Sequence, residues 1–95
     1  MSEELTRIRQ CFLKAFPSED HEYGRDVKRG LHSIFVNISK DERLIFKITD
    51  NCIDDNAVDK ILLEIEKNCF RALRSNPNKE CVLYSNFEIK IQNVT

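Results

Sequence analysis

Two neighbouring stretches of this sequence, residues 31–39 and 43–50, alternate apolar and polar side chains with a period of two. The apolar side chains that share one side are Ile34, Val36, Ile38, Leu44, Phe46 and Ile48. This period is typical of strands that bury one face, and a polar turn at 40–42 separates the two stretches. The sequence therefore predicts two paired strands.

Apolar side chains with helical spacing lie on both sides of this pair. They predict a first helix over residues 3–16, which Pro17 ends because proline disfavours helical geometry in the residue before it. They predict a second helix that Asp54 or Asp55 caps and that Asn76-Pro77 ends. The apolar stripe of this second helix is Val58, Ile61, Leu62, Ile65, Cys69 and Leu73.

The second helix has a wider apolar face than one sheet usually covers. Leu63 and Phe70 lie at the flank of its stripe. We therefore expect the first helix or a partner protein to bury these two side chains.

Residues 17–30 show no apolar period and are rich in charge. The segment predicts a long surface loop, and loops of this length are often either functional or disordered. Tyr23 lies within it and is a candidate for contact with a partner.

Residues 81–91 keep their apolar side chains on one parity. A single long strand explains this most simply. A hairpin turning at Ser85-Asn86 is the alternative, although it lacks the glycine that tight two-residue turns favour.

Together these elements predict one α+β domain over residues 1–95, a length that supports one modest core. The order is α-β-β-α-β in two layers. A crossover through the second helix would place the third strand beside the first, giving a three-stranded antiparallel sheet of order 2-1-3. Both helices then cover one face, and the other face carries Phe35, Ile45, Val82 and Tyr84.

The charge of the chain is nearly balanced, with 15 basic and 16 acidic residues and a net charge of −1. This balance argues against a strongly basic nucleic-acid binder. The stretch 25–47 is nevertheless locally basic, with six basic and three acidic residues. Its basic residues, Arg25, Lys28, Arg29, Lys40, Arg43 and Lys47, are the candidates for contact with phosphate.

The N-terminal residues are acidic where a signal peptide is basic, and no apolar run approaches the roughly 18 residues of a membrane span. We therefore expect a cytoplasmic protein without a membrane anchor. The four cysteines have no metal or redox spacing, which predicts buried structural thiols.

No motif for catalysis, metal binding or cofactor binding occurs in the sequence. The charged run at 19–22 and His32 have no partner that the sequence can name, and we interpret them as a solvated loop and a structural histidine. We expect no enzymatic activity, no metal and no cofactor.

The leading hypothesis is a small module that binds the surface of a partner protein, as inhibitors, immunity proteins, antitoxins, chaperones and adaptors do. The predicted contact residues are Phe35, Ile45, Val82, Tyr84, Tyr23, Leu63 and Phe70. The alternative is a nucleic-acid-binding regulator that uses the basic stretch 25–47. A homodimer through an unpaired edge strand or the second helix is compatible with either.

Overall fold

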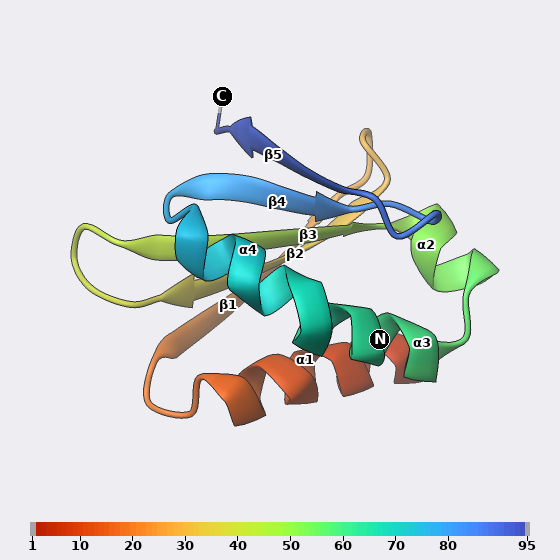
Figure 1. Ribbon diagram of the computed structural model, residues 1–95, viewed down its shortest axis with the longest axis horizontal. Helices are drawn as coiled ribbons and strands as arrows, with labels where there is room; N and C mark the ends of the chain where they lie inside the picture. The colour runs from red at the N-terminus through yellow and green to blue at the C-terminus, as the bar shows by residue number, and fades with distance from the viewer. Residues whose placement is uncertain (1, 95) are drawn as a thin grey trace.

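The computed structural model describes residues 2–94, which form a five-stranded mixed sheet with helices packed on one face (Figure 1). The elements are α1 (Glu3–Ala15), β1 (Asp20–Asp26), β2 (Leu31–Asn37), β3 (Arg43–Thr49), α2 (Asp50–Asp55), α3 (Val58–Glu64), η1 (Ile65–Cys69), α4 (Phe70–Ser75), β4 (Lys79–Leu83) and β5 (Ile89–Asn93). The α+β class is confirmed. The prediction of three strands is wrong.

Helix α1 begins and ends where its local chemistry indicates. The Ser2 side chain accepts a hydrogen bond from the Leu5 N–H at 3.2 Å, which satisfies one of the free donors of the first turn. At the other end the chain leaves the helix at Phe16, and the ring of His21 hydrogen-bonds the Phe16 carbonyl oxygen at 2.8 Å. The predicted first helix is thus confirmed.

The segment 17–30 is not a continuous loop, because β1 lies within it and pairs antiparallel with β2. Sequence reasoning missed this strand because it is an edge strand with mostly polar side chains, and its only large apolar group on the helix side is Tyr23, opposite Ile34. The turn after β1 needs a left-handed residue, and Gly30 supplies it with a φ of 63°.

The predicted pair of strands is confirmed as β2 and β3, with Ile34 opposite Phe46 and Phe35 opposite Ile45. Strand β4 does not lie beside β2, however. The sheet order is β1-β2-β3-β4-β5, and β4 runs parallel to β3. The predicted order 2-1-3 fails because β1 already occupies the free edge of β2, so that only the edge of β3 is open to β4.

The C-terminal segment is a hairpin and not one long strand. The Tyr84 N–H donates to the Glu88 carbonyl at 3.0 Å, and the Phe87 N–H donates to the Tyr84 carbonyl at 2.8 Å. Phe87 takes the left-handed turn position, with a φ of 64°, where glycine would be the ordinary choice. In the resulting register Leu83 lies opposite Ile89, and Cys81 lies opposite Ile91. Because these four residues all have odd numbers, the alternation of apolar and polar side chains continues through the turn and does not reveal it.

The predicted second helix consists of two parts. Asp54 and Asp55 belong to a separate short helix, α2, whose N-cap Thr49 accepts a hydrogen bond from the Cys52 N–H at 3.0 Å. The prediction that one of them caps the helix with the apolar stripe is wrong, because Ala57 holds the N-cap position of α3 and makes no side-chain hydrogen bond there. A second helical run then extends through α3, η1 and α4, with a π-helical stretch in its middle. Four of the six residues of its apolar stripe, Ile61, Ile65, Cys69 and Leu73, are buried as predicted, and Val58 and Leu62 are partly buried.

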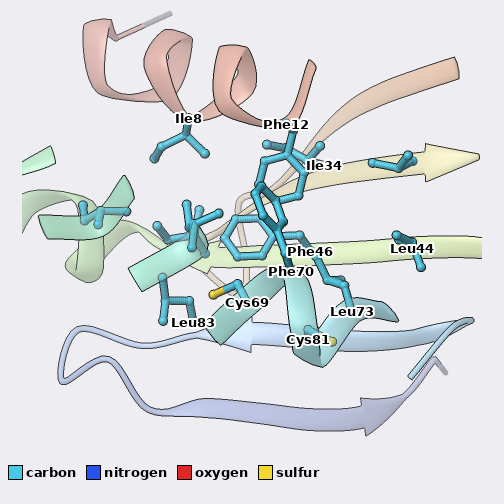
Figure 2. Packing of buried hydrophobic residues seen from close by; sticks show 14 of the residues in the cluster. Ile8, Phe12, Ile34, Leu44, Phe46, Cys69, Phe70, Leu73, Cys81 and Leu83 are labelled. Atoms are coloured by element: carbon cyan, nitrogen blue, oxygen red, sulfur yellow. The ribbon is translucent and has the colours of Figure 1, made fainter. Parts of the chain in front are cut away.

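The core lies between this helical layer and the inner face of the sheet. Phe12 from α1 contacts Phe46 from β3 at 4.9 Å and Phe70 from α4 at 5.1 Å between ring centroids (Figure 2). Phe70 is only 8% exposed and packs against Phe12, so the first helix buries it, as one of the two expected alternatives has it, and it is not open to a partner. None of the helices in residues 2–94 is both long and apolar enough to cross a bilayer.

Candidate protein-binding surface

The face of the sheet opposite the helices carries no helical cover in the described part of the chain (Figure 1). We call it the outer face. The strand registers place on it Glu22, Gly24, Asp26, Leu31, Ser33, Phe35, Asn37, Arg43, Ile45, Lys47, Thr49, Glu80, Val82, Lys90 and Gln92.

Phe35, Ile45 and Val82 lie on this outer face, as expected, and Tyr84 follows directly after β4. The face is nevertheless not a bare apolar patch. Ile45 is 6% exposed and Val82 is fully buried, while Phe35 and Tyr84 are partly buried. A partner could therefore contact Phe35 and Tyr84 directly, but Ile45 and Val82 only through their neighbours.

Long cationic side chains cover the two aromatic rings. The Arg43 guanidinium lies 4.0 Å from the centroid of the Phe35 ring, and the Lys90 ammonium lies 5.3 Å from that of Tyr84. The Phe35 ring lies over Gly24, where an added Cβ would be in ordinary van der Waals contact, 3.5 Å from the Phe35 Cε2 atom. Cation–π contacts of this kind hold both partners in place and keep the charge at the surface.

A buried ion network lies in the middle of the outer face. Glu80 accepts hydrogen bonds from Lys47 at 2.9 Å, from Arg29 at 3.3 Å and from Gln92 at 3.2 Å. Burial by itself would raise the pKa of Glu80, but these three hydrogen bonds outweigh it and lower that pKa. Glu80 is therefore a carboxylate at neutral pH, held by strands β3, β4 and β5 and by the turn after β1.

The six basic residues predicted to contact phosphate do not form one strip. Arg25 lies on the helix side and pairs with Asp50 at 2.7 Å, while Arg43 pairs with Glu22 at 3.3 Å. Arg29 and Lys47 share Glu80. Lys28 and Lys40 lie in turns at opposite ends of β2. Nucleic-acid binding stays a prediction, and four of its six residues are already paired with carboxylates.

The remaining predicted contact residues lie away from the outer face. Leu63 is 61% exposed on α3, on the helical side of the molecule. Tyr23 faces the helices, where the Arg9 guanidinium lies 4.9 Å from its ring centroid. The predicted surface is thus divided between both sides of the sheet.

Sequence reasoning missed a polar cluster that joins β1, β2 and α2. The Tyr23 hydroxyl lies 2.5 Å from His32 Nδ1, and His32 Nε2 lies 2.9 Å from an oxygen of Asp50. Arg25 donates to both oxygens of Asp50, at 2.7 and 2.9 Å, and its guanidinium also approaches His32 Nε2. The cluster could have been found only if β1 had been predicted as a strand, because its pairing with β2 places Arg25 opposite His32.

Three members of this cluster, Arg25, His32 and Asp50, line a hollow of about 610 Å³ together with the first turn of α1 and part of α2. Burial, aided by Arg25, lowers the pKa of His32 against the opposing effect of Asp50. Burial raises the pKa of Tyr23, because it also disfavours the charged form of this side chain. A neutral His32 imidazole can accept a hydrogen bond from the Tyr23 hydroxyl and donate one to Asp50, which satisfies both ring nitrogens. These hydrogen bonds connect β1, β2 and α2.

Three of the four cysteines are buried, as predicted for structural thiols, and Cys11 is not. Cys52, Cys69 and Cys81 are buried, Cys11 is partly buried, and all four are free. Burial raises the pKa of Cys69 to about 12 and those of the other three to about 11. Within residues 2–94, no group of three or more His, Cys, Asp or Glu side chains is placed to hold a metal ion.

No protein-family model, no curated protein sequence and no solved structure matches this chain.

Proposed function

We propose that this chain is a small protein-interaction module that binds a partner protein with its outer face. The observation that carries the proposal is the combination of an uncovered five-stranded face with two aromatic rings, Phe35 and Tyr84, that cations hold in place. Aromatic and arginine side chains dominate the binding energy of protein interfaces.

The outer face is also well fixed before a partner arrives. Arg43 is held by the ring of Phe35 and by Glu22, and Arg29 is held by Glu80. A side chain that is already ordered loses less conformational entropy on binding, which favours affinity. The ionic groups at the rim carry both signs, so they would select a partner by its pattern of charges and not by its net charge.

The test is co-purification of the tagged chain from its native cells, with the bound protein identified and quantified by mass spectrometry. We expect Tyr84→Asp and Lys90→Glu each to reduce the stoichiometric partner at least tenfold. Leu63→Asp is the matched control, because it places the same kind of charge on the helical side, and it should keep the partner. Circular dichroism establishes that every variant is folded.

Two outcomes would overturn the proposal. The first is a partner that Leu63→Asp removes and both outer-face variants retain. The second is nucleic acid as the only co-purifying species, recognised by its absorbance at 260 nm and by release on added salt.

A further inference from the structure

Strand β5 is an edge of the sheet, with β4 as its only neighbour in the described residues. The Tyr84 N–H donates to the Glu88 carbonyl, so these two residues form a hydrogen-bonded pair. Along an antiparallel ladder, hydrogen-bonded pairs alternate with pairs that are not hydrogen-bonded. Residues 88, 90 and 92 therefore turn their backbone groups towards β4. Ile89, Ile91 and Asn93 turn theirs outwards, where no described strand pairs with them.

The two edges of the sheet differ in how they are protected. Strand β1, with the sequence DHEYGRD, is dense in charge, which discourages pairing with another strand. Strand β5, with the sequence IKIQN, has one charge and two isoleucines. Ile91 is 39% exposed, and Val94 beyond the strand is also exposed. The unprotected edge is therefore β5.

We propose that β5 pairs antiparallel with β5 of a second copy of this chain, about a two-fold axis at Ile91. This register places Ile91 opposite Ile91 of the partner subunit and Ile89 opposite Asn93 of the partner subunit. Lys90 lies opposite Gln92 of the partner subunit, so no like charges meet. In this register, Ile89, Ile91 and Asn93, whose backbone groups point outwards, form the hydrogen bonds between the two strands.

The same symmetric pairing at the other edge would be unfavourable. Centred on Tyr23, it would place Asp20 of one β1 opposite Asp26 of the other. Like charges directly opposite each other destabilise a strand pair. The self-complementarity of β5, and its absence in β1, is what selects a second copy at the β5 edge.

The proposed dimer has one continuous sheet. Residues directly opposite in an antiparallel pair share a face, so the helices of both copies lie on one side and both outer faces lie on the other. Cross-strand contact between the two Ile91 side chains covers apolar surface that is exposed in the monomer. The pairing does not depend on the partner protein proposed above.

The test measures mass against concentration by analytical ultracentrifugation of the full chain. We expect a reversible shift from 11.2 kDa to twice that mass. Ile91→Pro should weaken dimerisation at least tenfold and leave the β4–β5 ladder intact, because the Ile91 N–H points away from β4. Ile91→Lys should also weaken dimerisation, whereas Val27→Lys, which adds the same charge at an exposed residue in the turn after β1, should not.

Amide hydrogen exchange gives a second measurement that does not need a variant. The Ile89, Ile91 and Asn93 amides should exchange more slowly as the protein concentration rises, while amides of β1 show no such dependence. A monomeric mass up to millimolar concentration would overturn the proposal. A dimer that survives both Ile91 variants would overturn it equally.

Discussion

Glu80 is a carboxylate that lies buried on a sheet face without helical cover. Its stabilising partners are Lys47, Arg29 and Gln92, and Lys47 is itself buried. Removing one charged member of such a network lowers the free energy of unfolding more than replacing all of its charged members, because the remaining charge stays buried without its partner.

Glu80→Gln should lower the free energy of unfolding by about 2 kcal/mol, because the Lys47 ammonium loses its counter-charge. The double change Glu80→Leu with Lys47→Leu should recover most of this loss. Urea unfolding at pH 7 measures both. A double variant less stable than Glu80→Gln would show that the network stabilises the fold beyond compensating for its own burial.

The second residue-scale prediction concerns His32, which faces Tyr23, Arg25 and Asp50. Its pKa is lower in the folded chain than the value of about 6.5 in an unfolded one, so the unfolded chain binds the proton more readily. The contribution of His32 to the free energy of unfolding is complete at a pH above its pKa in the unfolded chain. It is lost as the pH falls through its pKa in the folded chain.

Wild-type stability should therefore decrease between pH 7 and pH 5, and His32→Gln should decrease less over the same window. Thermal unfolding at a series of pH values measures the two slopes. Equal slopes for the two proteins would exclude His32 as their source.

Single residues were predictable from the sequence where a local rule decides their position. Pro17 follows the end of α1, as expected from the preference of the residue before a proline. Tyr23, His32 and Asp50 were not predictable as a cluster, because the sequence separates them and only the pairing of β1 with β2 brings them together.

The π-helical stretch η1 is the element whose geometry departs most from the regular pattern. Ile61, Ile65, Cys69 and Leu73 recur every four residues, and four residues of an α-helix turn about 40° past one full turn. Over three such steps Leu73 would rotate about 120° away from the core. The wider π turn absorbs this drift and keeps all four side chains buried.

Deletion of Asn68, an exposed residue of η1, should therefore be tolerated. It shortens one spacing from four to three, which suits a regular α-helix, and should change the free energy of unfolding by less than about 1 kcal/mol. Deletion of Gln10 in α1 is the control. It rotates Phe12 by about 100° about the helix axis from its present position against Phe46 and Phe70, and should cost more than about 3 kcal/mol. Urea unfolding compares the two deletions, and equal losses would contradict this interpretation of η1.

Strands were predictable where one face is apolar and the other polar, as in β2 and β3. Strand β1 lacks that contrast because it lies at an edge and is held mainly by its pairing with β2. The β4–β5 turn was hidden because its register preserves parity and because Phe87 occupies a position typical of glycine.

At the scale of the whole molecule, the three buried thiols, Cys52, Cys69 and Cys81, report on global unfolding. All four thiols have pKa values of about 11 to 12, which leave little thiolate at pH 8. Under native conditions a thiol reagent should modify Cys11 first and the other three only as the chain unfolds. Mass spectrometry of the labelled protein over time measures this order. Early modification of Cys69 would indicate a local opening between α4 and the sheet.

The order of strands in the sheet is the same as their order along the chain. During synthesis, each new strand therefore leaves the ribosome after the neighbour to which it will pair. No strand has to wait for a later one to fill a gap, and no strand has to be inserted between two that are already joined. The sheet can grow from one end to the other at the pace of translation, and β5 is the last of these five described strands to be added.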